Sequence, residues 1–144
     1  MPARERFPGV TQGRRRNMAA IRSKNTKPEM FIRKELHRRG YRFRLHSRRL
    51  PGKPDLVFAS RRKIIEVRGC FWHGHGCSLG QIPAARQNYW LPKLEATRVR
   101  DAANVAALEL AGWSVMECWE CDIRANGLAT VDALSRFLDT GQSG

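Results

Sequence analysis

The sequence predicts an α/β domain in which helices flank one mixed β-sheet. Segments with the helical period alternate with short apolar segments, in the order helix, β-meander, helix, strand, helix. The length of 144 residues also fits one ordinary domain. We therefore expect a single domain at residues 14–144. Residues 1–13, which contain Pro and Gly and lack periodicity, predict a flexible basic arm.

Two helices are expected before the sheet. Residues 14–24 (RRRNMAAIRSK) predict a short basic helix. Residues 26–39 predict a stronger one, because Thr26 and Glu29 form a capping box and Gly40 supplies the stop.

Three strands are expected next. The apolar side chains at positions 41, 43 and 45 alternate with Arg42, Arg44 and His46, which indicates a half-buried strand with a basic outer face. The turn LPGKP leads to a second strand at residues 55–59 (DLVFA). A turn at residues 60–62 leads to a third strand at residues 63–67 (KIIEV), so the last two strands predict a hairpin.

The second half of the chain predicts a loop followed by further helices and a strand. Residues 69–80 hold four glycines and no periodicity, which predicts a loop. We expect a helical turn at residues 91–95, a helix at 97–111, a strand at 113–118 and a final helix at 128–138. The helix faces expected to point inward are Val99, Ala103, Ala106 and Leu110, and then Leu128, Val131, Leu134 and Leu138.

The composition points to a polyanionic partner. Lys and Arg total 27 against 13 Asp and Glu, which gives a formal charge of +14. The positive charges on so short a chain repel one another. Binding to nucleic acid or, as an alternative, to an anionic membrane surface would offset this repulsion. No segment reaches the roughly 18 apolar residues of a spanning helix, which disfavours the membrane. The first residues lack the apolar run of a secretory signal, so we expect a cytoplasmic protein with reduced cysteines.

Two carboxylates mark a candidate catalytic metal site. Asp55 opens one strand of the hairpin and Glu66 lies near the end of the other, so both fall at one end of the sheet. Two carboxylates and a main-chain carbonyl suit Mg²⁺, which activates water and offsets charge on phosphoryl oxygens. Arg68, on the face of Glu66, would stabilise the transition state. The alternative is a turn aspartate with a solvated Glu–Arg pair, and the motif taken alone favours that alternative.

A compact cluster of cysteine and histidine predicts a zinc site. Cys70, His75 and Cys77 lie within eight residues, and Cys118 or Cys121 can add a fourth ligand. Thiolates and one imidazole suit tetrahedral Zn²⁺, and a full protein shell makes the ion structural. Buried free cysteines with a surface histidine are the alternative, which the close spacing disfavours.

Residues around this cluster are candidates for chemistry and for DNA contact. If His75 binds zinc, His73 can serve as a general acid or base, although a lone histidine is more often a polar surface group. The adjacent aromatics Phe71–Trp72 and Tyr89–Trp90 suit a wedge or a stacking platform for bases, and Lys93 suits a phosphate. The alternative places at least one of these four aromatics in the core.

Together these residues resemble the Vsr family, the very-short-patch-repair endonucleases that nick DNA beside a T:G mismatch. The resemblance runs from about Arg16 to Cys121, and GCFWHGHGC is its most specific part. The further matching segments are NMAAIRSKNTKPE, LPGKPDLVF, the Trp90 segment, Arg100-Asp101 and GWSVMECWEC.

The resemblance implies a restriction-endonuclease-like fold and a set of site residues. Asp55 would bind the catalytic metal together with the main-chain carbonyl of Val67. His73 would be the catalytic histidine, supported by Asp101, and Glu29 would be a further active-site carboxylate. The structural zinc would be held by Cys70, His75, Cys77 and Cys121.

The resemblance also implies how DNA is bound. Phe71, Trp72 and Trp90 would form an intercalating wedge. Met18 and the arm would approach from the other groove, and Lys93 would lie near the mismatch.

The chain departs from the best-known family pattern at three positions. That pattern lacks an acid at position 66 and has threonine at position 67 and histidine at position 68. This chain instead has Glu66, Val67 and Arg68. A main-chain ligand survives a change to valine, but a threonine hydroxyl role does not. Glu66 and Arg68 also move the site toward the PD…(D/E)xK arrangement of restriction-type nucleases.

Three functions follow as expectations. The first is a Mg²⁺-dependent endonuclease of the bacterial cytoplasm, nucleoid-associated when bound, that acts as a monomer. It would nick double-stranded DNA next to the T of a T:G mismatch and leave a 5′-phosphate, with mismatch-repair proteins as further candidate partners. The second is a restriction or defence endonuclease without mismatch dependence, and the third is a non-catalytic zinc-stabilised DNA-binding module. We favour the first, because wedge aromatics and a full metal site occur together.

Overall fold

The computed structural model describes residues 26–73, 75–77, 80–82 and 84–141. The predicted arm at residues 1–13, the predicted basic helix at residues 14–24 and Met18 lie outside the described residues.

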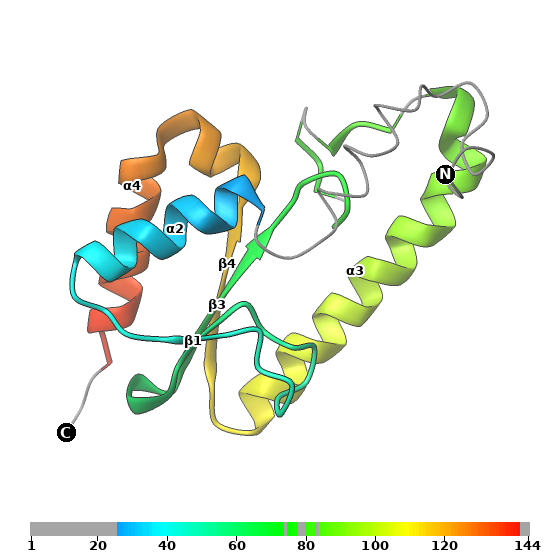
Figure 1. The fold of residues 1–144 in the computed structure, drawn as a ribbon. Coiled ribbons are helices and arrows are strands. Elements are labelled where there is room, and N and C mark those ends of the chain that lie inside the picture. Colours follow the sequence, from blue (N-terminus) through cyan, green and yellow to red (C-terminus); the bar gives the residue numbers. More distant parts are fainter. Residues whose placement is uncertain (1–25, 74, 78–79, 83, 142–144) are drawn as a thin grey trace, which may run out of the picture.

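A four-stranded mixed sheet forms the centre of the described part of the chain (Figure 1). The strands are β1 (Arg44–Leu45), β2 (Leu56–Phe58), β3 (Lys63–Arg68) and β4 (Ser114–Trp119), in the spatial order β1-β2-β3-β4. Strands β1, β2 and β3 pair antiparallel, and β4 pairs parallel to β3. The predicted hairpin and the mixed sheet are therefore confirmed.

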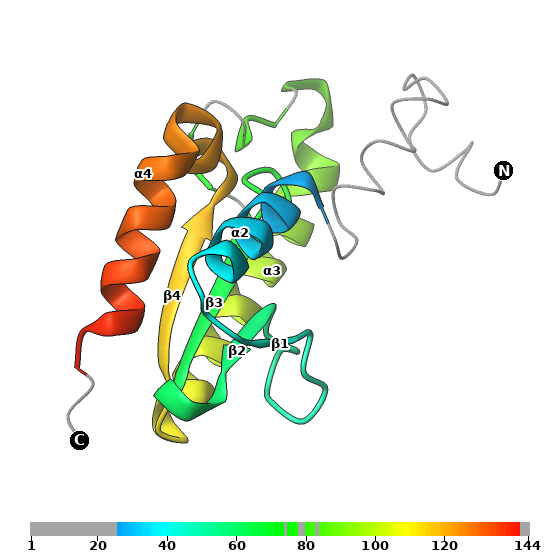
Figure 2. The same cartoon turned by 60° about the vertical axis from the view of Figure 1, so that its left-hand side comes forward.

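Helices cover both faces of this sheet (Figures 1 and 2). They are α2 (Lys27–Arg38), α3 (Gln87–Leu110) and α4 (Glu120–Asp139). Consecutive residues of β3 point to opposite faces, so Ile65 packs against α2 and α4, whereas Ile64 packs against Leu108 of α3. This alternation also places Glu66 and Arg68 on the α3 side, where the candidate active site lies.

Local sequence signals account for the ends of α2. The side chain of Thr26 accepts a hydrogen bond from the N–H of Glu29 at 3.4 Å, as the capping box predicts. Gly40 has a φ of +98°, which glycine adopts without a steric cost, and it turns the chain from α2 toward β1. The predicted strand at residues 41–45 is shorter in the structure, because only Arg44 and Leu45 pair with β2.

The predicted turn at residues 91–95 and the predicted helix at 97–111 are wrong as separate elements. They form the single helix α3, which begins at Gln87 and contains Pro92. Proline removes only one helical hydrogen bond, and here the helix continues through it.

The predicted inward face of α3 is also wrong. Val99 is 60% exposed and Leu110 is 91% exposed, whereas Trp90, Leu94 and Leu108 are buried. The middle of the inward face instead carries polar side chains, among them Asp101 and Asn104, which line a cavity. The spacing of apolar residues therefore does not mark the buried side of this helix.

Helix α4 starts earlier than the sequence predicts. It begins at Glu120, and Asn126 interrupts it with φ −161° and ψ 89°. The Asn126 side chain accepts a hydrogen bond from the N–H of Ala129 at 3.0 Å, so it caps the second segment. That segment corresponds to the predicted helix at residues 128–138. Its inward residues Val131, Leu134 and Leu138 are confirmed, but Leu128 is 58% exposed.

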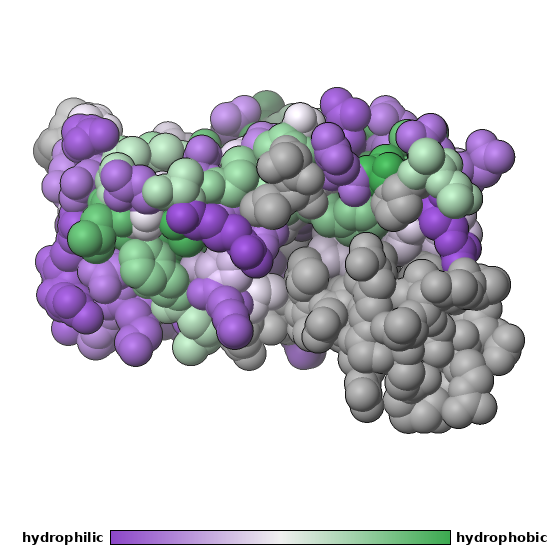
Figure 3. Space-filling view, turned by 90° about the horizontal axis from the view of Figure 1, so that it is seen from above, coloured by the Kyte–Doolittle hydropathy of each residue, from purple (hydrophilic) through white to green (hydrophobic). Residues whose placement is uncertain are grey.

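The surface is polar on the face seen from above, where hydrophilic side chains surround small apolar patches (Figure 3). Within the described residues, we find no helix whose length and apolar character would let it cross a membrane.

Candidate active site and metal centre

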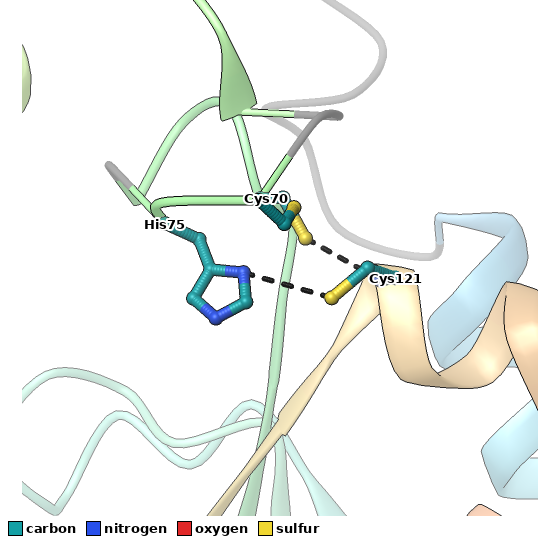
Figure 4. Close-up of side chains that lie close together, drawn as sticks. Cys70, His75 and Cys121 are labelled. Carbon is teal, nitrogen blue, oxygen red and sulfur yellow. Dashed lines mark hydrogen bonds between the residues drawn. The ribbon is translucent and has the colours of Figure 1, made fainter.

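The four predicted zinc ligands come together at the end of β3. Their ligand atoms, from Cys70, His75, Cys77 and Cys121, all lie within 4.8 Å of one another. Three of them point toward one another in Figure 4, where the Sγ atom of Cys121 lies 3.6 Å from Nδ1 of His75. Tetrahedral zinc with bonds of roughly 2.0–2.3 Å separates its ligand atoms by about 3.3–3.8 Å. The geometry and the donor set therefore fit zinc.

The structure distinguishes the two cysteines that the spacing left open. Cys121 lies in the first turn of α4 and belongs to the cluster. Cys118 lies on β4 and is buried in the core formed with α2 and α4. Burial raises the pKa of the Cys70 thiol to about 12. Thiolate ligation at neutral pH thus requires a metal that displaces the proton.

Two residues not predicted from the sequence contact the predicted zinc ligands and hold them in place. Trp119 stacks on His75, with ring centroids 4.1 Å apart and an interplanar angle of 11°. Glu120 accepts a hydrogen bond from the N–H of Cys70 at 3.4 Å and pairs with Arg124 at 2.8 Å. These contacts fix the ring and the backbone that present the ligands.

All the predicted active-site residues line one cavity of about 580 Å³ on the α3 side of the sheet. They are Glu29, Asp55, Glu66, Val67, Arg68, His73 and Asp101. They come from α2, from the turn before β2, from β3, from the loop after β3 and from α3. The fold thus collects side chains that are far apart in the sequence.

The two carboxylates of the hairpin are interlocked with the backbone. Glu66 accepts a hydrogen bond from the N–H of Asp55 at 3.1 Å, and Asp55 accepts one from the N–H of Val67 at 2.8 Å. Burial, and secondly the negative charge of Asp55, raises the pKa of Glu66 to about 7. Burial also raises the pKa of Asp55, against the hydrogen bond from Val67. Buried acids that repel each other in this way suit a divalent cation.

Arg68 links two further acids and keeps one donor available. Its Nε atom donates to Glu117 at 3.0 Å, and its Nη1 atom donates to Asp101 at 3.3 Å. The Nη2 atom is buried and has no hydrogen-bond partner within the part of the chain that the structure describes. Since an unmet buried donor is costly, a ligand oxygen in the cavity is its natural partner.

His73 is oriented by Asp101. The Nδ1 atom of His73 lies 2.6 Å from Oδ2 of Asp101, which favours the proton on Nδ1 and leaves Nε2 for proton transfer. A histidine held by a carboxylate is a common arrangement for a general base or acid.

His46 is a member of the site that the sequence did not reveal. The strand pattern places it on a basic outer face, but its Nε2 atom lies 2.7 Å from Oε2 of the buried Glu29. Its position directly before the LPGKPD turn is the one signal that it lies near Asp55. The partner from α2 is distant in sequence and could not be inferred.

The predicted wedge aromatics pack against one another. Ring centroids of Phe71, Trp72 and Trp90 are separated by 4.9–5.3 Å, and Trp72 and Trp90 are buried. The expectation that at least one of the aromatics is buried is thus confirmed. A groove beside this cluster of about 430 Å³ is lined by Lys93 and His73. This groove lies next to the active-site cavity, since His73 lines both.

Comparison with known proteins identifies the family of this chain. The family model of the DNA mismatch endonuclease Vsr matches residues 10–79. Type II nicking enzyme V.XorIIP of Xanthomonas oryzae pv. oryzae is 56% identical over 127 residues, which are 88% of this chain and 92% of the relative. DNA mismatch endonuclease Vsr of Escherichia coli is 37% identical over 126 residues, 88% of this chain and 81% of the relative.

A third relative is type II nicking enzyme V.NmeAIP of Neisseria meningitidis. It is 40% identical over 121 residues, which are 84% of this chain and 86% of the relative. Each of these three alignments spans more than four fifths of this chain. The chain therefore belongs to the Vsr family of DNA endonucleases.

Proposed function

We propose that this endonuclease is Mg²⁺-dependent and nicks double-stranded DNA next to the T of a T:G mismatch, in very short patch mismatch repair. The observation that carries the proposal is the single cavity that joins two interlocked carboxylates, a buried guanidinium and a carboxylate-held histidine. This combination is the set of groups that phosphodiester hydrolysis needs.

The catalytic cation would be held by Asp55, Glu66 and the main-chain carbonyl of Val67. The raised pKa values of Asp55 and Glu66 reflect negative charge that is buried and, in the protein alone, poorly compensated. A divalent cation bound there supplies Lewis acidity toward a phosphoryl oxygen and lowers the pKa of a bound water.

Arg68 and His73 would act on the substrate directly. Arg68 would donate from Nη2 to a phosphate oxygen, where negative charge grows in the transition state. His73 would accept or give a proton at Nε2, while Asp101 holds the opposite ring nitrogen.

The zinc would serve the same reaction indirectly. Its proposed ligands Cys70 and His75 flank the segment that carries His73, and Cys121 ties this segment to α4. Structural zinc would therefore fix the position of the catalytic histidine relative to Asp101.

Mismatch recognition would lie in the neighbouring groove. Phe71, Trp72 and Trp90 would open from their packed arrangement and enter the base stack, with Lys93 on a phosphate. Met18 and the basic arm would contact the opposite groove. We further propose a restriction-endonuclease-like fold, a monomer, contact with mismatch-repair proteins, and a bacterial cytoplasmic location with nucleoid association.

A second candidate is a restriction or defence nuclease that needs no mismatch. The observation that favours it is the presence of Glu66 and Arg68 in the cavity, as in restriction-type sites. Nicking of matched and T:G duplexes in Mg²⁺ tests both. We expect cleavage of one strand of the T:G duplex only, with a 5′-phosphate product. Equal cleavage of both duplexes would establish the second candidate, and no cleavage of either would leave a DNA-binding module.

A further inference from the structure

A second group of metal-ligating side chains lies beside the proposed Mg²⁺ ligands. It consists of Glu29 from α2, His46 after β1 and Asp55 before β2. Their ligand atoms all lie within 4.8 Å of one another. The group is largely shielded from solvent, since the side chains of Glu29, His46 and Asp55 are 4%, 13% and 23% exposed.

The backbone aims His46 into this group. Its N–H donates to the main-chain oxygen of Asp55 at 3.0 Å, directly beyond the paired residues Leu45 and Leu56. His46 also has a φ of +47°, a left-handed conformation that is uncommon for residues other than glycine, although Asn, Asp and His adopt it more often than the rest. Such a conformation persists where its surroundings require it, and it is frequent at functional sites.

The distances between the ligand atoms fit one cation shared by the three side chains. The Nε2 atom of His46 lies 2.7 Å from Glu29 and 3.9 Å from Oδ1 of Asp55. Ligand atoms of one six-coordinate ion with bonds of roughly 2.1 Å lie about 3 Å apart at right angles and about 4 Å apart across the ion. A neutral imidazole with two carboxylates also gives a site of net negative charge.

We infer that His46 is a metal ligand and that Glu29, His46 and Asp55 bind a transition cation of the Mn²⁺ class. Mg²⁺ takes oxygen ligands, so a nitrogen ligand shifts the preference of this position toward Mn²⁺. The inference rests on the proposed function, because Asp55 would also hold the Mg²⁺. A plain hydrogen bond between His46 and Glu29 is the competing explanation, and it predicts no nitrogen bonded to the ion.

Electron spin-echo spectroscopy of Mn²⁺ added to the zinc-loaded protein tests this inference. We expect ¹⁴N modulation from a directly bound imidazole in the wild type. His46→Gln and His46→Asn should abolish the modulation and weaken Mn²⁺ binding about tenfold or more, a loss of the size seen when metal-site partners are removed. Mg²⁺ affinity should change less than Mn²⁺ affinity.

Three controls make the result specific. His37→Gln changes an exposed histidine of α2 and should leave the modulation intact. His73→Ala should also leave it intact, which excludes the histidine that lines the active-site cavity as the source of the signal. Zinc content and circular dichroism of the His46 variants should match the wild type.

The inference is overturned if the wild type shows no ¹⁴N modulation or binds no Mn²⁺, or if the modulation persists in both His46 variants. Its failure is distinguishable from failure of the proposed function. A protein that nicks T:G duplexes without a His46-dependent signal refutes the inference alone. A protein with that signal but without nicking refutes the proposed function alone.

Discussion

The carboxylate of Asp101 is shared between His73 and Arg68. One oxygen lies 2.6 Å from Nδ1 of His73, and the other accepts a hydrogen bond from Arg68 at 3.3 Å. A single side chain of α3 thus positions both groups that we assign to the scissile phosphate. Its replacement should therefore affect catalysis more than substrate binding.

Asp101→Asn should lower kcat for nicking about a hundredfold or more, with little change in KM. The amide can offer its N–H to His73 and so favour the wrong tautomer, and general acid–base catalysis contributes about 10²–10⁴-fold. His73→Ala should cause a similar loss, and the double variant should lose little more. Asp132→Asn, which affects a surface pair with Arg39, is the matched control. Additive losses in the double variant would contradict the shared role.

Stability should fall with pH while Mg²⁺ is absent. The folded-state pKa of Glu66 is raised from 4.5 to about 7, so the folded protein holds a proton that the unfolded chain releases. The stabilisation is complete below pH 4.5 and is lost as pH rises to about 7. It should amount to on the order of 2–3 kcal/mol.

Urea unfolding at several pH values, in Mg²⁺-free buffer without chelator so that zinc is retained, measures this dependence. Glu66→Gln should flatten the curve between pH 4.5 and about 7, whereas Glu95→Gln on the exposed side of α3 should not. Added Mg²⁺ should stabilise more at higher pH, because it needs ionised carboxylates. A Glu66→Gln curve equal to that of the wild type would refute the assignment.

Arg68→Lys should separate stability from activity. Lysine keeps the charge that compensates Asp101 and Glu117, but its three N–H groups share one nitrogen and cannot reproduce the planar fork of a guanidinium. We expect unfolding free energy to fall by about 1 kcal/mol or less and nicking to fall about a hundredfold. Arg68→Met should also lower the free energy of unfolding by about 1–3 kcal/mol. This range is below that of a fully buried ion pair because Glu117 is partly exposed. Full activity of Arg68→Lys would exclude the proposed phosphate contact.

The cysteine pair of the β4–α4 junction offers a matched test of zinc. Cys121→Ser should lose stoichiometric zinc, nicking activity and several degrees of Tm, because it removes a proposed ligand. Cys118→Ser changes a buried core thiol and should keep zinc near one per chain. Elemental analysis distinguishes the two. Equal zinc content in both variants would remove Cys121 from the ligand set.

Much of the fold follows from local sequence signals. The capping box at Thr26 and the turn at residues 60–62 that joins the hairpin strands are read directly, because both depend on neighbours within a few residues. The sequence wrongly predicts two elements in place of helix α3 because Pro92 resembles a helix break. It also predicts the wrong inward face because the polar residues Asp101 and Asn104 line the cavity there. Periodicity detects a buried apolar face and fails where the inward face carries polar side chains that line a cavity.

For the site, too, prediction succeeds for residues that are close in sequence and fails for contacts between distant segments. The zinc cluster was visible because Cys70, His75 and Cys77 are close in sequence, and the choice of Cys121 came from family resemblance. His46 and Glu117 were missed because their partners lie on other elements. Contacts between distant segments depend on how helices pack across the sheet, which periodicity does not specify.

Consecutive side chains of β3 point to opposite faces of the sheet, so a shift of the strand by one residue would move each side chain to the other face. Ile65 faces the core of α2 and α4, whereas Glu66 and Arg68 face the cavity. Inserting one residue in the tight turn at residues 60–62 would, if pairing with β4 shifted by one, exchange the two sets. The charged side chains would then enter the apolar core, and isoleucine would enter the cavity. Natural variation in length should therefore be excluded from the turn before Lys63.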